Sequence, residues 1–312
     1  MLRRTLILTF HIISMHLTNK TQEISQLLID DLLLPADFNE VVTSVYLPLI
    51  AHILNKKTDK PLFISINGAQ GTGKSTLTRF LKKIIEGESG LSVADISLDD
   101  FYSTRSEREQ LANSIHPLLK TRGVPGTHDI QLMENTLLKL LEGHACTIPR
   151  FNKAADDRHV EDQWSKYEKN TDIILFEGWC NHSPSQSDSE LSSPINELEL
   201  TNDPDGIWRH YVNEQLKGYH QRIFSHADMS IMLKAPDFEK IYEWRSLQEK
   251  KLKQSTKPSD QSRIMSSDEL KRFIQHYERI SRHTFEHLPD IADVVIPIAE
   301  DHSIKNIIKR HD

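Results

Sequence analysis

The stretch "GAQGTGKS", Gly68 to Ser75, decides the fold of this 312-residue chain. It matches G-x-x-x-x-G-K-[ST], in which glycines let backbone N–H groups turn inward around phosphate oxygens. The preceding run "KPLFISING" (60–68) is short, apolar and β-branched, and it predicts a buried strand. The following "KSTLTRFLKKIIEGE" (74–88) has apolar residues at helical spacing and predicts a helix whose positive end faces the phosphates. Strand, loop and helix in this order predict nucleoside triphosphate binding.

The loop residues have distinct expected roles at the nucleotide. Lys74 is expected to reach the β and γ phosphates, and Ser75 to ligate Mg²⁺ through its hydroxyl. The guanine-reading N-K-x-D is absent, since "NKAA" (152–155) lacks the aspartate, which favours ATP over GTP. The expected nucleotide-binding residues are Gly68, Ala69, Gln70, Gly71, Thr72, Gly73, Lys74, Ser75 and Thr76.

Short apolar strands alternate with helices along the rest of the chain. The fold class predicted is therefore α/β, a P-loop NTPase fold with a parallel central sheet flanked by helices. Ser266 and Glu269 are spaced as a capping box. The polar segment 183–206 predicts a long surface loop, and 253–263 a flexible stretch. Further strands are expected at 91–98, 171–178, 227–235 and 292–299, and helices at 21–33, 39–56, 129–143, 237–254 and 266–288.

Composition narrows the class of protein. The formal net charge is -7, and this lack of a basic excess argues against a nucleic-acid partner. Cys146 and Cys180 lie far apart and form no C-x-x-C, which disfavours a disulfide framework and fits a reducing cytoplasm. We expect a cytoplasmic protein that binds neither nucleic acid nor membrane.

The first 17 residues, "MLRRTLILTFHIISMHL", imitate a signal peptide only faintly. His11, Ser14 and His16 interrupt the apolar run, no small-residue cleavage site follows, and the run is too short and polar to span a membrane. The segment is a first strand or helix, or it precedes a true start at Met15.

Carboxylates follow two of the expected strands. "LDDFY" (98–102) ends the strand at 91–98, and "FEGW" (176–179) ends the strand at 171–178. In a doubly wound sheet, ligands bind at the carboxyl ends of strands. An aspartate there can accept a proton from a substrate hydroxyl or cap the next helix. Glu177 can hold Mg²⁺ through water, polarise a nucleophile, or be a loop acid.

"TRGVPGTHD" (121–129) predicts a loop of fixed shape, because Gly and Pro are dense in it. An anionic acceptor beside ATP needs fixed positive partners. A guanidinium can hold a carboxylate with two parallel bonds, so we expect Arg122 to hold such an acceptor, with bracing of its own loop as the alternative.

Together with "GAQGTGKSTL", the strings "SLDDFY", "HPLLKTRGVPGTHD", "IPRFNKAADDR", "FEGWC", "PINELE" and "WRSLQEKKL" carry a family resemblance. The chain resembles the phosphoribulokinase and uridine kinase group of P-loop kinases, and within it the D-glycerate 3-kinase family, over about residues 40 to 300. The resemblance implies an ATP- and Mg²⁺-dependent kinase that phosphorylates a hydroxyl of a small hydroxy acid, with D-glycerate the expected acceptor.

The resemblance also implies residue roles. Asp99 stands two before Phe101, where the group places its catalytic Asp, and it is grouped with Lys74 and Glu177 as catalytic. Arg245 is an expected lid cation on the phosphates, or a solvated helix charge. The expected metal ligands are Ser75, Asp100 and Glu177; the expected substrate-binding residues are Asp100, Tyr102, Arg122, His128, Arg150, Lys153 and Arg158; and Trp179 and Trp208 shape the acceptor pocket or pack in the core.

The expected organisation is an N-terminal extension and helix (1–35), then one kinase domain (36–312) with acceptor-binding insertions at about 103–170 and 180–210. Two alternatives stay open. One is a P-loop kinase of pantothenate, uridine or a sugar. The other is a regulatory P-loop ATPase, in which water replaces the acceptor and a rigid cationic second pocket has no use. The oligomeric state stays open.

Overall fold

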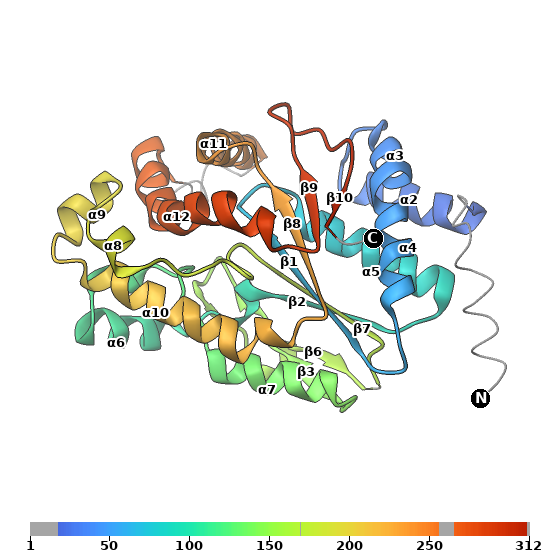
Figure 1. Ribbon diagram of the computed structural model, residues 1–312, viewed down its shortest axis with the longest axis horizontal. Coiled ribbons are helices and arrows are strands. Elements are labelled where there is room, and N and C mark those ends of the chain that lie inside the picture. Colours follow the sequence, from blue (N-terminus) through green and yellow to red (C-terminus); the bar gives the residue numbers. More distant parts are fainter. Residues whose placement is uncertain (1–17, 169, 256–264, 311–312) are drawn as a thin grey trace.

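A six-stranded sheet organises the computed structural model, which describes residues 18–168, 170–255 and 265–310 (Figure 1). The strand order is β10-β9-β8-β1-β7-β2, and β10 alone runs antiparallel to its neighbour. The predicted P-loop fold with a parallel central sheet is confirmed; β10 was not predicted. The strands are β1 (Leu62–Gly68), β2 (Val93–Ser97), β7 (Ile173–Gly178), β8 (Met229–Lys234), β9 (Val294–Pro297) and β10 (Ile308–Lys309).

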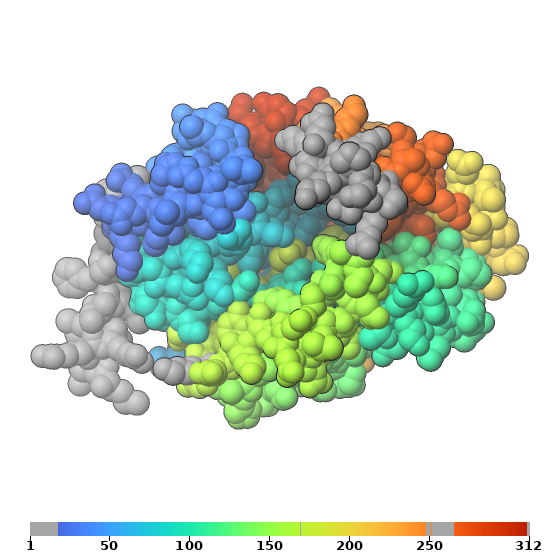
Figure 2. All heavy atoms as spheres, turned by 180° about the vertical axis from the view of Figure 1, so that it is seen from behind, coloured from blue at the N-terminus to red at the C-terminus, as the bar shows by residue number. Residues whose placement is uncertain are grey.

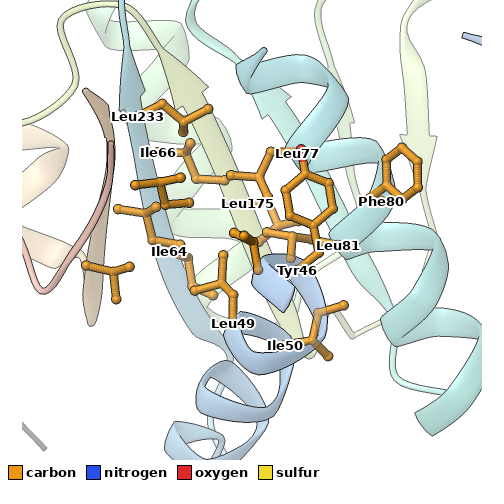
Figure 3. Close-up of a cluster of buried hydrophobic side chains, with 14 of the residues drawn as sticks. Tyr46, Leu49, Ile50, Ile64, Ile66, Leu77, Phe80, Leu81, Leu175 and Leu233 are labelled. Carbon is orange, nitrogen blue, oxygen red and sulfur yellow. The ribbon is translucent and has the colours of Figure 1, made fainter. Parts of the chain in front are cut away.

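Both faces of the sheet are covered, so the side chains of its central strands are buried on both sides. Every residue of β1 is buried. Successive side chains of a strand point to opposite faces. Ile64 and Ile66 pack with Leu77 and Leu81 of α5 on one face (Figure 3). Phe63 packs with the second cluster, to which α7 and α10 contribute, on the other.

Five of the six predicted helices form near the expected bounds. The segment 39–56 is instead divided into α3, a π-helical turn (Val42–Tyr46) and α4, and Pro48 in the first turn of α4 cannot donate an intrahelical bond. The helices are α2 (Asn19–Asp31), α3 (Phe38–Val41), α4 (Leu47–Lys56), α5 (Lys74–Ser89), α6 (Arg105–Ser114), α7 (Ile130–Leu141), α8 (Asp188–Leu191), α9 (Glu197–Asn202), α10 (Ile207–Arg222), α11 (Phe238–Ser255) and α12 (Ser267–His287).

The prediction of a surface loop at 183–206 was wrong, because α8 and α9 lie within it and bury Leu191 and Leu198. Each helix begins with a side-chain cap, Ser187 for α8 and Asn196 for α9. The helices α6 and α10 were not predicted either. By contrast, the capping box of Ser266 and Glu269 is present at the start of α12. The helices α8 and α9 thus form within a polar segment because a cap and one or two buried side chains suffice.

Two small antiparallel pairs lie beyond the main sheet, and neither was predicted. β3 (Cys146–Ile148) pairs with β6 (Ser165–Tyr167), and β4 (Phe151–Asn152) pairs with β5 (Asp157–Arg158). The hairpin of β4 and β5 carries the charged string "PRFNKAADDR", so it presents these residues toward the end of β2.

The first 17 residues and 256–264 lie outside the described residues. The interpretations of the N-terminal run, and most of the flexible stretch predicted at 253–263, fall on these residues. The helix α2 packs on α5 and buries Leu28 and Ile29 in the same cluster as β1. The division of the chain at residue 35 stays a prediction. Among the described residues, no helix combines the length and apolarity needed to cross a membrane.

Candidate active site

The nucleotide loop lies at the carboxyl end of β1 and leads directly into α5. Gly71 and Gly73 have φ of 83° and 87°, a conformation that costs glycine little. A Cβ on Gly68 would come within 2.6 Å of Thr72 Oγ1, so a side chain there would displace the loop. Lys74 Nζ donates to the carbonyl of Ala69 at 3.2 Å. The loop therefore has the closed shape in which backbone N–H groups can surround phosphate.

Ser75 and Glu177 meet beside this loop. Ser75 Oγ donates to Glu177 Oε1 at 2.9 Å, although the residues are 102 positions apart. The meeting follows from the parallel pairing of β1 with β7, which places Asn67 opposite Gly178. A hydroxyl and a carboxylate oxygen are hard ligands of the kind that Mg²⁺ prefers, so these two residues fit the ion.

Asp99 lies in the 3₁₀ turn (Leu98–Phe101) after β2 and is held by two donors. Tyr102 Oη donates to its Oδ1 at 2.6 Å, and Lys153 Nζ donates to its Oδ2 at 2.6 Å. Burial tends to raise the pKa of Asp99, but Lys153 and Tyr102, with the charge of Lys74, lower it below the ordinary value. The carboxylate is therefore ionised at neutral pH and lies within electrostatic reach of the nucleotide loop.

Asp100, its neighbour, has different partners. It forms an ion pair with Arg150 and accepts from the backbone N–H of Phe151 at 3.4 Å. Burial outweighs these contacts and raises the pKa of Asp100. Two adjacent carboxylates thus have pKa values shifted in opposite directions, and Asp100 joins the turn after β2 to the hairpin of β4 and β5.

We call the segment "TRGVPGTHD" (121–129) the acceptor loop. Aromatic side chains form hydrogen bonds with its backbone. Trp179 Nε1 donates to the carbonyl of Gly123 at 2.8 Å, and Tyr277 Oη donates to that of Arg122 at 3.0 Å. Gly123 has φ of 123°, and a Cβ there would lie 2.1 Å from Tyr277 Oη. The fixed shape predicted for this loop therefore depends on contacts that only glycine permits.

Arg122 and His128 of the acceptor loop differ in charge. Arg122 forms an ion pair with Asp156, which lies in the turn between β4 and β5. The guanidinium carbon of Arg122 lies 5.6 Å from the centroid of the Phe151 ring. His128 Nδ1 lies 2.8 Å from Tyr219 Oη. Burial lowers the pKa of His128 to about 3, so its imidazole is neutral. Its Nε2 is buried without a hydrogen-bond partner in the described part of the chain.

The cations of "PRFNKAADDR" have separate tasks. Arg150 Nε donates to Ser165 Oγ at 2.9 Å in addition to its bond with Asp100. Arg158 donates to the carbonyl of Tyr102 at 3.1 Å. Both arginines therefore brace the chain around the turn after β2. Lys153, whose side chain is 63% exposed, is the more exposed of the two donors to Asp99.

Arg245 and the two tryptophans occupy different depths. Burial raises the pKa of Tyr277, and the charges of Arg122 and Arg245 oppose this rise. Arg245 on α11 therefore lies within electrostatic range of Tyr277, which bonds to the acceptor loop. Trp179 is 5% exposed, packs in the second core cluster and also contacts that loop. Trp208 is 2% exposed and packs edge-on against His276 at 5.9 Å in the core.

Three residues of this site were not singled out by any sequence pattern. Tyr277 and Asp156 contact Arg122, and His302 Nε2 lies 2.7 Å from the carbonyl of Gly71. His302 also stacks on Trp244, with ring centroids 4.3 Å apart. Tyr277 occupies an ordinary apolar position of α12, and His302 follows the last long strand by a few residues, so neither carries a sequence pattern of function.

These elements surround one recess. Figure 2 shows the surface hollowed between the cyan helix α5 and the yellow-green segment around the β4–β6 strands. The carboxyl ends of β1, β2 and β7 supply the nucleotide loop, Asp99 and Glu177. The recess thus combines a phosphate loop, two ligands suited to a hard cation (Ser75 and Glu177) and the ionised carboxylate of Asp99.

Comparison with known proteins agrees with this geometry. The model of the Phosphoribulokinase / Uridine kinase family matches residues 63–183. The uncharacterized kinase mug58 of Schizosaccharomyces pombe is 33% identical over 231 residues, which cover 71% of this chain and 80% of that protein. The chain belongs to the phosphoribulokinase/uridine kinase family.

Other members are also similar to this kinase. The chloroplastic D-glycerate 3-kinase of Arabidopsis thaliana is 31% identical over 228 residues, or 70% of this chain, although the match spans only 46% of that protein. Among solved structures, D-glycerate 3-kinase from Cryptococcus neoformans shares the fold with a TM-score of 0.68 at 24% identity, covering 85% of this chain and 96% of that chain. The expected family and P-loop kinase class are confirmed: the protein is a small-molecule kinase.

Proposed function

We propose that this kinase transfers the γ phosphate of ATP to a hydroxyl of a small hydroxy acid, with D-glycerate as the acceptor. The observation that carries the proposal is the ionised carboxylate of Asp99, held between Lys153 and Tyr102 within electrostatic reach of Lys74 in the nucleotide loop. The 31% identity with a D-glycerate 3-kinase supports the choice of acceptor.

ATP binds along Gly68 to Thr76, with Lys74 on the β and γ phosphates. Ser75 and Glu177 would hold Mg²⁺, and Asp100 is a further expected ligand that would share its carboxylate with Arg150. When bound, the ion would supply positive charge that offsets the charge of the phosphates. Arg245 is the expected lid cation, since it lies on α11 near the acceptor loop.

Asp99 accepts the proton of the acceptor hydroxyl as that oxygen attacks the γ phosphate in line. Each carboxylate oxygen has one donor in this structure and keeps a lone pair that can take the proton. Of the two donors, Lys153 can make room for the acceptor more easily, because its side chain is 63% exposed whereas Tyr102 is 5% exposed. In a loose transition state, positioning and charge neutralisation outweigh the base.

Arg122 binds the carboxylate of the acceptor. Its guanidinium pairs with the Asp156 carboxylate in this structure, and a substrate carboxylate can take the same place. Tyr102, His128, Arg150, Lys153 and Arg158 complete the expected substrate-binding set. His128 is neutral, so it contributes a hydrogen bond and no charge; Arg150 and Arg158 contribute by bracing.

An acceptor screen tests the proposal. ATP turnover is followed by a coupled assay, first alone and then with D-glycerate, pantothenate, uridine or a sugar. We expect almost no turnover without acceptor and the highest kcat/KM with D-glycerate. Preference for uridine or another uncharged acceptor would support the alternative kinases, and turnover independent of acceptor would support a regulatory ATPase.

A further inference from the structure

Away from the recess, α8 and α12 bring together one carboxylate and two imidazoles. Glu190, His283 and His287 each have a potential ligand atom, and these atoms all lie within 4.8 Å of one another. His283 Nδ1 lies 3.5 Å from Glu190 Oε1, and the two imidazole centroids are 4.2 Å apart. The histidines are four residues apart on α12, so they share a face of the helix.

The carboxylate of Glu190 is already oriented. Its Oε2 accepts from the backbone N–H of Ser187 at 2.7 Å and from Ser187 Oγ at 2.6 Å, which leaves Oε1 toward His283. Arg279, one helical turn before His283, donates to the carbonyl of Glu190 at 3.0 Å. Arg279 is itself fixed by a buried ion pair with Glu199 at 2.6 Å. Such supporting bonds are typical of metal ligands.

The charges around the cluster favour a cation. His287 is the last residue of α12, where the free carbonyl groups of a helix attract positive charge. The Glu286 carboxylate lies 3.9 Å from His287 Nε2.

We propose that Glu190, His283 and His287 bind one Zn²⁺ ion. Two imidazoles and one carboxylate are a ligand set typical of zinc, whereas Mg²⁺ and Ca²⁺ prefer oxygen alone. Metal–ligand bonds of about 2.0–2.2 Å in a tetrahedron separate ligand atoms by about 3.3–3.6 Å. Small side-chain rotations bring the three atoms to that spacing, and water completes the coordination.

The ion would join the segment of α8 to α12. Since α12 also carries Tyr277, which holds the acceptor loop, zinc would stabilise the wall behind that loop. The site differs in chemistry from the oxygen pair of Ser75 and Glu177 in the recess.

Zinc binding is measured on full-length, tag-free protein, freed of metal and titrated in competition with a chromophoric chelator in excess Mg²⁺. We expect one tight equivalent. Loss of a bond that merely supports a ligand costs about 10–100-fold in affinity, so His287→Ala and Glu190→Gln should weaken binding by at least about tenfold. His287 is the decisive position, because its side chain is 46% exposed and its removal spares the core.

His144→Ala is the matched control. His144 Nδ1 lies 3.1 Å from Glu142 Oε2 on an exposed surface, and the described residues give this pair no third ligand. It should bind zinc as the wild type does. Zinc should also raise the thermal unfolding midpoint of the wild type and this control, but not that of His287→Ala. The proposal is overturned if His287→Ala retains the wild-type affinity, or if His144→Ala loses as much.

Discussion

Asp99 and Asp100 are adjacent in the chain but differ in every contact. Asp99 faces Lys153 and Tyr102 with a lowered pKa, and Asp100 faces Arg150 with a raised one. The sequence places the pair at the end of a strand but cannot divide the roles, because the division depends on which side of a 3₁₀ turn each carboxylate points to.

Asp99→Asn keeps the shape of the side chain but cannot accept a proton. We expect kcat to fall by about 10²–10⁴, the range for loss of a general base, with nucleotide affinity nearly unchanged. Steady-state kinetics and nucleotide titration measure the two effects. Asp100→Asn is the comparison; if it lowers kcat more than Asp99→Asn while remaining folded, our assignment within the pair is wrong.

Lys153→Ala should change the pH dependence of turnover. Asp99 is active when ionised, and Lys153 contributes to holding its pKa below the ordinary 3.8. Without that charge the effect of burial is less opposed and the pKa of Asp99 in the free enzyme rises, so kcat/KM for the acceptor should begin to fall at a higher pH as the solution is acidified. Profiles of kcat/KM against pH test this, with Lys166→Ala, an exposed lysine of β6, as control. Coincident acid limbs in all three proteins would refute it.

Arg122→Lys replaces a planar guanidinium by an ammonium, which cannot form two parallel bonds to a carboxylate. A bond to a charged group contributes about 1.5–3 kcal/mol, so KM for the acceptor should rise roughly 10- to 150-fold while KM for ATP is nearly unchanged. Arg105→Lys, at an exposed arginine of α6, should alter neither value. An unchanged acceptor KM in Arg122→Lys would mean that this residue only braces the loop.

At the scale of elements, apolar patterns predicted the parallel strands and most long helices, because those segments are buried on a regular face. The patterns failed for α6, α8 and α9, where burial is confined to one or two side chains, and for α10, whose buried face mixes apolar and polar residues. The segment 183–206 is polar, yet Glu199 on α9 is fully buried and pairs with Arg279 of α12 at 2.6 Å. A buried charge is satisfied by a residue 80 positions away, which no local pattern predicts.

Glu199→Gln leaves the Arg279 guanidinium buried without its counter-charge. Breaking a buried ion pair in this way costs about 3–5 kcal/mol. Urea unfolding should show this loss in the free energy of unfolding. Glu239→Gln is the matched control, because Glu239 pairs with Arg282 of the same helix at an exposed position, where such a pair contributes about 0–1 kcal/mol. Equal losses in the two variants would contradict the importance of burial.

At the scale of the whole molecule, the chain returns to its own nucleotide loop. His302 follows β9, the neighbour of β8 in the sheet, and bonds to Gly71, 231 residues earlier. The sequence predicted the loop itself in full, since its glycines and lysine are local. It could not predict this contact or that of Tyr277, because each depends on how distant segments pack.

His302→Ala should loosen the nucleotide loop. A hydrogen bond contributes about 0.5–1.5 kcal/mol, so KM for ATP should rise about 2- to 12-fold while KM for the acceptor stays unchanged. His226→Ala, at an exposed histidine before β8, should have no effect on either constant. If both KM values rise together in His302→Ala, the contact stabilises the fold generally and not the loop.

The aromatic support of the acceptor loop has a consequence for protein engineering. Trp179 and Tyr277 bond to main-chain carbonyls, and Tyr219 accepts from the backbone N–H of Gly126 at 2.9 Å. These bonds are indifferent to which side chains the loop carries, provided that its glycines are kept. Under the proposed function, exchange of the outward-facing residues would change substrate preference without rebuilding the scaffold. A nine-residue graft from a relative with another acceptor would then transfer the specificity of that relative.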